Sequence, residues 1–294
     1  MKKPELSIII VNYNSFGVLK DCLSSLEKVS NEAAFEAILV ENGSTDESGK
    51  KIRSLRCKSY ELKTIQNGKN VGFGAANNQA RSLAQGKYIL FLNPDTIVHK
   101  NTLRNTLQYI KAHEDVGAVT CKMVLPDGKL DRDARRSFPT PWVALTHFLF
   151  LDRIFPSSKL FSRYWYGYKS AEKDQEVDVA QAAFAMLPRG VLDGVGWFDE
   201  DYFLDGEDID LSYRLNLAGY KIIYLAGVSI THVKKVSKKH AGKKSTESIR
   251  AGTMGMRLFY KKHLGKKYPF FVNLAIYSSI SLLTYLRVIM NLFK

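Results

Sequence analysis

The sequence predicts an α/β fold in which a mostly parallel central sheet carries helices on both faces. Two observations support this prediction. Short apolar runs alternate with longer segments of helical spacing, and polar residues directly follow several of the apolar runs. A hydrophobic share of 45% over 294 residues is enough to bury such a core, as one large domain or as one domain with an appendage.

Strands and helices alternate most clearly over the first 121 residues. The expected strands are residues 6–11, 37–40, 62–65, 88–92 and 117–121. The expected helices are residues 16–29, 45–56, 74–84 and 102–112. Ligands of such folds bind outside the carboxyl ends of the strands, which predicts a binding site formed by the polar segments that follow them. These segments are residues 12–14, 41–44, 67–74 and 93–96.

Basic residues gather at the C-terminal end. Residues 231–294 hold 14 Lys and Arg against the single acid Glu247, a net charge of +13 out of the formal +14 of the whole chain. Residues 268–286 carry no charge, and polar and apolar side chains of 268–294 fall on opposite sides of a helical wheel. We therefore expect a helix that lies in an anionic membrane surface, ahead of one that spans it; a helix packed on the domain or on a dimer partner is the alternative.

Composition argues against several other classes of protein. Nucleic acid is disfavoured as a partner because the lysine-rich segment has no interleaved aromatic residues. Cys22, Cys57 and Cys121 are widely spaced and form no CxxC pair, which argues against a disulfide framework and a zinc cluster and fits a reducing cytosol. Residues 6–11 are too short for a signal-peptide core, so the N-terminus is expected to begin the fold.

Two acidic segments and one histidine suggest chemistry. Residues 93–95 (Asn-Pro-Asp), residues 207–210 (Glu-Asp-Ile-Asp) and His232 together could hold a divalent cation and, separately, deprotonate a hydroxyl. This pairing suggests transfer chemistry on a phosphate-bearing donor. The plainer interpretations are a turn at 93–95, an acidic first helical turn at 207–210 and a surface histidine.

Five segments, taken in order, resemble a known family. The order is similar to that of the family 2 glycosyltransferases of GT-A fold, and most similar to their rhamnosyltransferase-like branch, which builds O-antigen and other bacterial surface polysaccharides. The resemblance spans residues 6–264. The segments are residues 7–14 (SIIIVNYN), 41–46 (ENGSTD), 70–77 (NVGFGAAN), 93–95 (NPD) and 197–211 (WFDE to EDIDL).

The resemblance implies a division of the chain. A GT-A domain would cover residues 1–230, with a nucleotide-binding half at 1–121 and an acceptor-binding half at 122–230. A basic flexible loop and helix would follow at 231–267, and a C-terminal amphipathic, hydrophobic helix at 268–294. The lysine-rich loop 234–248 is expected either to close over a diphosphate or to remain a solvated loop. The aromatic segment 142–168 is expected to form a small helical insertion that touches the acceptor or the membrane.

The resemblance also implies roles for individual residues. Asp208 would be the catalytic base that takes the proton of the acceptor hydroxyl, and Asp95 with His232 would bind Mn²⁺ or Mg²⁺. Asn93 replaces the first acid of the family's Asp-x-Asp motif, which implies a metal site completed by the donor diphosphate. Ala182 stands where many relatives have glycine, and its extra methyl group would make the acceptor side of the binding site narrower. The nucleotide-binding set is Val11, Tyr13, Glu41, Asn70, Gly72 and Asp95, and the acceptor-binding set is Trp197, Glu207 and Asp210.

The activity that the resemblance implies is inverting transfer of one sugar from a nucleotide-diphosphate donor, with dTDP-rhamnose as the donor typical of the branch. The acceptor would be lipid-linked or a polysaccharide, and the enzyme would be peripheral at the cytoplasmic face of the cell membrane. Glu41 replaces the Asp that accepts the pyrimidine N3–H, which uracil and thymine share, so a UDP-sugar donor stays open. A nucleotidyltransferase or a non-catalytic nucleotide-sugar binder is the alternative of a different class.

Overall fold

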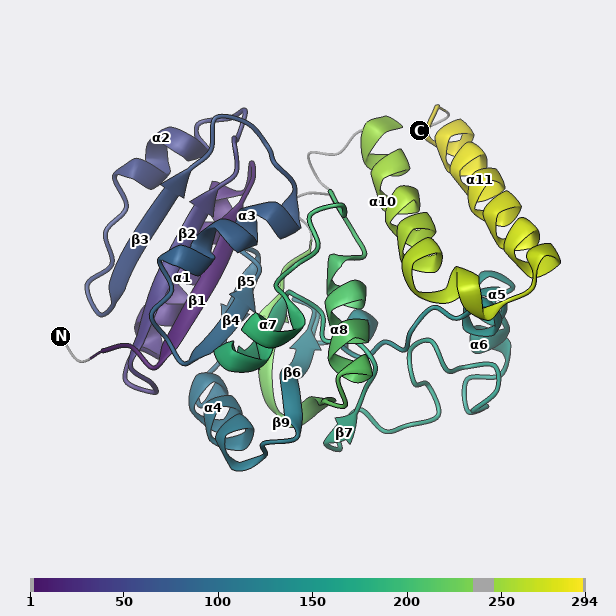
Figure 1. Ribbon diagram of the computed structural model, residues 1–294. Helices are drawn as coiled ribbons and strands as arrows, with labels where there is room; N and C mark the ends of the chain where they lie inside the picture. The colour runs from purple at the N-terminus through teal and green to yellow at the C-terminus, as the bar shows by residue number, and fades with distance from the viewer. Residues whose placement is uncertain (1–2, 235–245, 293–294) are drawn as a thin grey trace.

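A single mixed sheet forms the centre of the protein (Figure 1). The computed structural model describes residues 3–234 and 246–292. Within these residues the sheet has nine strands in the order β3-β2-β1-β4-β8-β6-β9-β5, with β7 paired to β9. Its strands are β1 Leu6–Asn12, β2 Phe35–Glu41, β3 Glu61–Gln66, β4 Tyr88–Leu92, β5 Thr96–Val98, β6 Val116–Val124, β7 Gln175–Glu176, β8 Phe184–Pro188 and β9 Lys221–His232.

The first half of the sheet is parallel, as predicted. β3, β2, β1 and β4 pair side by side in parallel, with Ile8 opposite Ala37 of β2 and Leu90 of β4. Every residue of β1 and β2 is buried, which shows that both faces of these strands are covered. The carboxyl ends of β1, β2 and β4 therefore meet at one edge.

The second half of the sheet is mixed, which differs from the mostly parallel sheet that the sequence predicts. β8 runs antiparallel to β4 and β6, and β9 runs parallel to β6 but antiparallel to β5 and β7. β5 and β7 are only three and two residues long, too short to show a pattern. The sequence predicted boundaries after residues 121 and 230, but β6 continues across the first and β9 across the second. One continuous sheet therefore joins the parts that the sequence separated.

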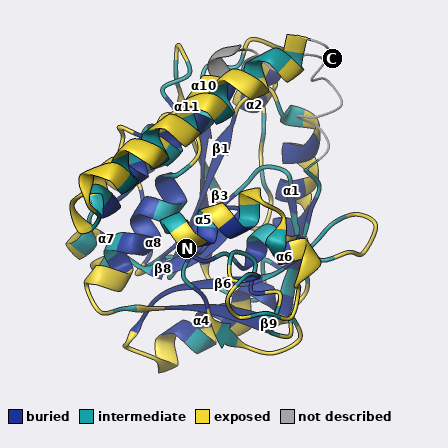
Figure 2. Ribbon diagram, turned by 90° about the vertical axis from the view of Figure 1, so that its right-hand side faces the viewer, coloured by how far each residue is buried: buried dark blue, intermediate teal, exposed yellow. Residues whose placement is uncertain are grey.

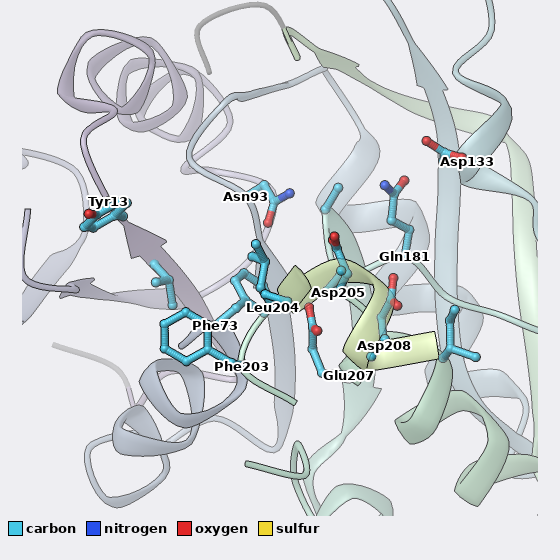
Figure 3. A pocket seen from close by; sticks show the side chains of 18 of the residues that line it. Tyr13, Phe73, Asn93, Asp133, Gln181, Phe203, Leu204, Asp205, Glu207 and Asp208 are labelled. Carbon is cyan, nitrogen blue, oxygen red and sulfur yellow. The ribbon is translucent and has the colours of Figure 1, made fainter. Parts of the chain in front are cut away.

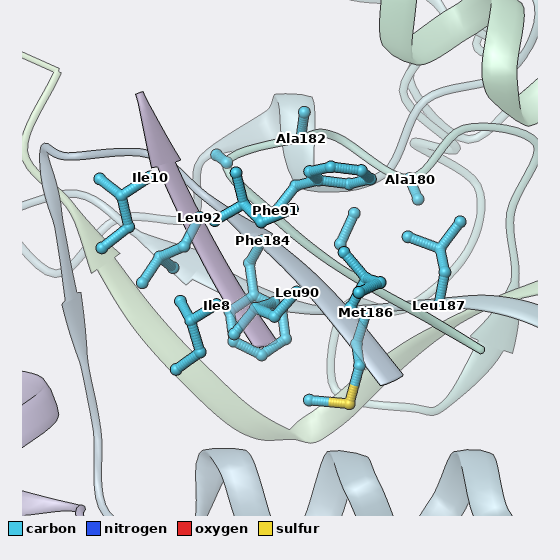
Figure 4. Packing of buried hydrophobic residues seen from close by; sticks show 14 of the residues in the cluster. Ile8, Ile10, Leu90, Phe91, Leu92, Ala180, Ala182, Phe184, Met186 and Leu187 are labelled. Atoms are coloured by element: carbon cyan, nitrogen blue, oxygen red, sulfur yellow. The ribbon is translucent and has the colours of Figure 1, made fainter. Parts of the chain in front are cut away.

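The expected helices of the first half are present. They are α1 Phe16–Lys28, α2 Ser48–Arg53, α3 Phe73–Gln79 followed by a 3₁₀ turn at Ala80–Ser82, and α4 Thr102–Ala112. α1 buries Leu19, Cys22, Leu23 and Leu26, which share one face of the helix. The core between β1, β4 and β8 is built from side chains such as Ile8, Phe91 and Phe184 (Figure 4).

The second half of the chain adds short helices around the sheet. A 3₁₀ turn spans Arg132–Ala134, and the expected helical insertion appears as α5 Pro141–Phe148 and α6 Leu151–Ile154. α7 Arg189–Val195 and α8 Glu207–Leu217 follow β8. Residues 235–245 of the lysine-rich segment lie outside the described residues. The prediction that this segment closes over a diphosphate therefore stays a prediction.

The C-terminal part forms a helical hairpin beside the sheet domain (Figure 1). α10 Thr246–Phe259 continues through a π-helical turn at Tyr260–Leu264 and a 3₁₀ turn at Gly265–Lys267 into α11 Phe270–Leu292. A second cluster of buried residues, which includes Tyr202, Tyr213 and Phe259, joins α8 to this hairpin. α11 is long and apolar enough to cross a membrane, yet none of its apolar window is buried (Figure 2).

Candidate active site

A cavity of about 1120 Å³ opens at the carboxyl edge of the parallel strands (Figure 3). The sheet contributes Val11, Tyr13 and Asp95, and the start of α8 contributes Glu207 and Asp208. α10 closes another side of the cavity with residues such as Gly252 and Met256. The edge on which the sequence placed a binding site is therefore the edge that carries the cavity.

The end of the cavity near β1 and β2 is organised by Asn42, which sequence reasoning did not single out. Asn42 is 2% exposed, and its Nδ2 donates to Asn70 Oδ1 at 3.0 Å and to the Gly72 carbonyl at 3.2 Å. Its Oδ1 accepts from Asn67 Nδ2 at 3.0 Å and from the Val71 amide at 3.1 Å. These bonds hold the loop after β3 against the end of β2. Asn70 borders the cavity as predicted, together with Val11, Tyr13 and Asp95.

Two residues of the predicted nucleotide set do not border the cavity. Glu41 is 3% exposed, and its carboxylate accepts from the amides of Gly43 at 3.2 Å and Ser44 at 2.8 Å. It braces its own loop because its side chain turns back onto these amides. Gly72 has φ +92°, and a Cβ there would lie 2.8 Å from the Phe203 carbonyl. Because residue 72 is a glycine, the segment before α8 can approach its backbone closely. The sequence instead predicted that Gly72 contacts a ligand.

Asp95 and His232, the predicted metal ligands, lie side by side. β5 pairs with β9, with Thr96 opposite His232, which brings His232 Nε2 to 3.4 Å from Asp95 Oδ1. His232 is buried behind Asp95, and only Asp95 borders the cavity. Burial lowers the pKa of His232, but hydrogen bonds to Asp131 and Asp95 outweigh it and raise the pKa to about 9.

Asp131 orients His232 and was not foreseen from the sequence. Its Oδ2 lies 2.9 Å from His232 Nδ1, so the ring donates from Nδ1, and its Oδ1 accepts from Lys234 Nζ at 2.7 Å. Burial raises the pKa of Asp131, but these two partners outweigh it and lower the pKa to about 2. A carboxylate on the second ring nitrogen is the usual support of a metal-binding histidine.

The donor set fits a metal site that a ligand must complete. Among the described residues no group of three or more His, Cys, Asp or Glu side chains is arranged to hold an ion. Asp95 offers oxygen, and His232 would offer Nε2 once a metal displaces its proton, while Nδ1 stays bonded to Asp131. Two protein ligands leave most coordination positions of Mn²⁺ or Mg²⁺ to oxygen donors from elsewhere, as a diphosphate would provide.

The start of α8 presents two carboxyl groups to the cavity. Asp205 and Gly206, with φ of +64° and +105°, turn the chain into the helix. Asp208 accepts from Nη2 of Arg136, and both residues border the cavity. The structure thus pairs the largely buried side chain of Arg136 with Asp208. The ion pair fixes the position of the Asp208 carboxylate at the cavity wall.

Glu207 lies beside Asp208 in a different environment. Burial raises the pKa of Glu207, and the neighbouring charge of Asp208 raises it further. Glu207 is 8% exposed, and its Oε2 has no hydrogen-bond partner among the described residues. Gln181, which also borders the cavity, leaves its Oε1 unpaired in the same way. Both groups are therefore placed to bond a ligand in the cavity, and Gln181 was missed as a site residue.

Trp197 and Asp210, both predicted to bind acceptor, do not reach the cavity. Trp197 is 6% exposed and packs edge-on against Phe91, with ring centroids 5.9 Å apart. Asp210 is 1% exposed and accepts from Arg214 Nε at 2.8 Å and from His263 Nε2 at 2.6 Å. Because Asp210 follows Asp208 by two residues, it points to another side of α8, where it braces the helix against the hairpin.

Comparison with solved structures defines the class of the protein. The chain is similar to GalNAc-T7 solved with UDP, GalNAc and Mn²⁺, with a TM-score of 0.63 and 14% identity over 89% of this chain and 49% of that one. It is also similar to the mannosyltransferase PcManGT from Pyrobaculum calidifontis in complex with GDP-Man and Mn²⁺, with a TM-score of 0.55 and 18% identity over 87% of this chain and 65% of that one. The fold is thus the GT-A fold of glycosyltransferases, as the sequence predicts.

The chain belongs to glycosyl transferase family 2, whose family model matches residues 7–196. It is similar to the rhamnosyltransferase WbbL of Escherichia coli (strain K12), with 25% identity over 76% of this chain and 82% of WbbL. It is equally similar, at 25% identity over 78% of this chain and 76% of the relative, to the N-acetylglucosaminyl-diphospho-decaprenol L-rhamnosyltransferase of Mycobacterium tuberculosis (strain ATCC 25618 / H37Rv). The O-antigen biosynthesis protein RfbC of Myxococcus xanthus is also 25% identical, but the chain spans only 18% of its length. The protein is a glycosyltransferase, as predicted.

Proposed function

We propose that this glycosyltransferase moves rhamnose from dTDP-rhamnose to a lipid-linked diphosphate acceptor, with inversion at the anomeric carbon. The observation that carries the proposal is that Asp208 and Asp95 border one cavity, together with Val11, Tyr13 and Asn70. A base and a diphosphate site must face the same substrate complex in a direct displacement. The choice of rhamnose and of a lipid diphosphate follows the names of the relatives.

Different residues of the cavity have different roles in the proposed transfer. Asp208 accepts the proton of the acceptor hydroxyl as that oxygen attacks the sugar carbon, and Arg136 holds the carboxylate in position. Asn42 holds Asn70 at the nucleotide end. Asp95 and His232 would hold a divalent cation, which when bound would supply Lewis-acid stabilisation of the departing diphosphate. Glu207 and Gln181 orient the acceptor through their unpaired oxygens.

The expected location is the cytoplasmic face of the membrane. α11 has 23 residues and a mean hydropathy of 1.4, and Lys261, Lys262, Lys266 and Lys267 precede it. It also lies along α10, whose residues border the cavity, so a spanning orientation would draw the catalytic edge into the bilayer. A helix that lies in the interface keeps the cavity in water and places it near a lipid-linked acceptor.

Calorimetric titration with dTDP, UDP, GDP and CDP, each with and without Mn²⁺, tests the donor site. We expect dTDP to bind in the presence of Mn²⁺ and about tenfold more weakly to the Asp95→Ala variant. Stronger binding of UDP would move the proposal to a UDP-sugar donor. Binding of none of the four with Mn²⁺ would refute the nucleotide-sugar site. A transfer assay then separates a transferase from a non-catalytic binder. It measures release of dTDP from dTDP-rhamnose together with transfer of the sugar to a polyprenyl-diphosphate acceptor.

A further inference from the structure

The segment of α5 and α6 exposes an unusual density of large apolar side chains. Within residues 142–160, seven such side chains are at least 46% exposed. They are Trp142, Leu145, Leu149, Phe150, Ile154, Phe155 and Leu160. Single exposed apolar residues are ordinary, but so many in one short segment mark a surface that another body covers. We call this set the α5–α6 surface.

The charges around the α5–α6 surface have one sign. Arg153, Lys159 and Arg163 are exposed, whereas Asp152, the single acid of residues 141–163, is buried. Asp152 Oδ2 lies 2.8 Å from Nδ1 of His147, and its Oδ1 is buried without a hydrogen-bond partner among the described residues, so this carboxylate faces into the segment and not toward the surface. An apolar, aromatic surface with only basic groups at its rim is complementary to a lipid interface with anionic headgroups.

The α5–α6 surface is fixed to the hairpin that carries α11. Phe138, which precedes α5, packs edge-on against Tyr213 with ring centroids 5.0 Å apart. It belongs to the same cluster as Ile276 and Tyr277 of α11. Figure 1 shows α5 and α6 beside the end of the hairpin where the chain turns into α11. Two exposed apolar elements far apart in the sequence are thus held together by one aromatic cluster.

α11 and the residues that flank the α5–α6 surface border the cavity. Pro139 and Tyr164, on either side of that surface in the sequence, contribute to the cavity wall, and so does Arg287 of α11. If α11 and the α5–α6 surface meet the same bilayer, the cavity opens at the headgroup level.

We propose that the α5–α6 surface is a second membrane-contact site, which binds an anionic lipid interface together with α11. Insertion of aromatic and aliphatic side chains would set the tilt of the enzyme on the bilayer, which α11 alone leaves free to rotate about its axis. This assignment goes beyond the proposed function and does not depend on the sugar. With that function, it gives a lipid-linked acceptor a path to Asp208 along the membrane surface.

Flotation of the full chain with vesicles tests the contact. The vesicles are phosphatidylcholine alone or phosphatidylcholine with phosphatidylglycerol. We expect the double variant Leu149→Glu, Ile154→Glu to bind the anionic vesicles about tenfold less than the wild type, because two inserted side chains are lost. Leu217→Glu is the matched control, since Leu217 is 65% exposed at the end of α8, and it should bind like the wild type. Unchanged melting temperatures show that the variants fold.

Quenching of tryptophan fluorescence by brominated lipids gives an independent readout. Of the three tryptophans, Trp142 is 46% exposed, Trp165 is half-buried and Trp197 is 6% exposed, so quenching should occur in the wild type and fall strongly in the Trp142→Phe variant. Undiminished vesicle binding by the double variant, or no quenching that depends on Trp142, would overturn the proposal. A change from dimer to monomer in lipid-free sedimentation, with vesicle binding unchanged, would assign the surface to a second copy of the chain. No donor or acceptor is present in these measurements, so their failure is distinct from failure of the proposed function.

Discussion

Glu207 and Asp208 are neighbours in the sequence, yet their surroundings give them different properties. Asp208 is held by the guanidinium of Arg136. Glu207 has no charged partner of its own, and burial beside the Asp208 carboxylate raises its pKa. A carboxyl group that keeps its proton can donate a hydrogen bond to an acceptor oxygen, while its neighbour serves as the base. Two adjacent acids can thus orient and deprotonate the same acceptor.

The raised pKa of Glu207 predicts a pH-dependent loss of stability. The folded protein binds this proton more tightly than the unfolded chain, so the free energy of unfolding falls as pH rises from the unfolded pKa through the raised folded pKa. Glu207→Gln removes this loss. Urea unfolding should show the variant more stable than the wild type by about 1–3 kcal/mol at pH 9, with a smaller difference at pH 5. Parallel pH profiles for the two proteins would contradict the burial of an uncompensated charge at this position.

Asp131 matters through His232, so its removal should weaken metal binding. In Asp131→Asn the ring of His232 loses its anionic hydrogen-bond partner, and we expect the apparent Kd for Mn²⁺ in the presence of dTDP to rise 10- to 100-fold. Electron paramagnetic resonance of free Mn²⁺ measures this constant. Asp133→Asn is the control, because Asp133 pairs with Lys234 and does not contact His232. Equal affinities for wild type and Asp131→Asn would show that the histidine does not bind the metal.

The sequence could predict those site residues whose type and position after a strand carry the signal. Asp95 and Asp208 fall into this class, and both reach the cavity. Asp131, Gln181 and Asn42 follow no recognisable catalytic pattern, because their roles arise from partners distant in the chain, such as His232 for Asp131. Trp197 and Asp210 do not border the cavity, because adjacency in sequence does not fix which side of an element a residue faces.

At the scale of elements, the position of α8 depends on α10. A Cβ at Gly255 would lie 2.0 Å from the Asp205 carbonyl, and one at Gly252 would lie 3.0 Å from the Asp205 carboxylate. Backbone contact this close is possible only for glycine. The turn that starts α8, and with it Asp208, is therefore held by a helix that follows it by some 40 residues in the sequence.

Gly255→Ala should disturb this contact. The added methyl group forces α10 away from Asp205, and we expect a loss of about 1–3 kcal/mol in the free energy of unfolding and a lower kcat. Gly194→Ala in α7 is the control, since a Cβ there meets nothing within 4 Å and should leave both quantities nearly unchanged or slightly raise stability. Chemical denaturation and a transfer assay measure the two effects. An unimpaired Gly255→Ala enzyme would show that α10 does not position the turn.

The sheet shows which elements a pattern can and cannot reveal. The parallel strands β1 and β2 are mostly apolar because both of their faces are covered. Their apolar runs were sufficient to predict both strands from the sequence. β8 was missed, although its residues Phe184 to Leu187 are buried, because a short apolar run of this kind also fits a loop or a helix. Its antiparallel pairing with β4 is a tertiary property that local sequence does not encode.

At the scale of the whole molecule, the cavity lies where the carboxyl edge of the parallel strands, the start of α8 and the C-terminal hairpin meet. His263 of the hairpin bonds to Asp210 of α8, and Lys262 pairs with Asp199 and Asp201. The element expected to meet the membrane is thereby bonded to the helix that carries the proposed base. The proposed contact with the bilayer would therefore be coupled to the geometry of the site through these bonds.

The central claim is that Asp208 deprotonates the acceptor in a transfer reaction from a nucleotide sugar. The most direct test is Asp208→Asn, with transfer measured from dTDP-rhamnose to a polyprenyl-diphosphate acceptor and dTDP binding measured by calorimetry with Mn²⁺. We expect the transfer rate to fall by a factor of about 10²–10⁴ while the Kd for dTDP stays within about twofold of the wild type. Transfer at the wild-type rate by Asp208→Asn would contradict the assignment of Asp208 as the base.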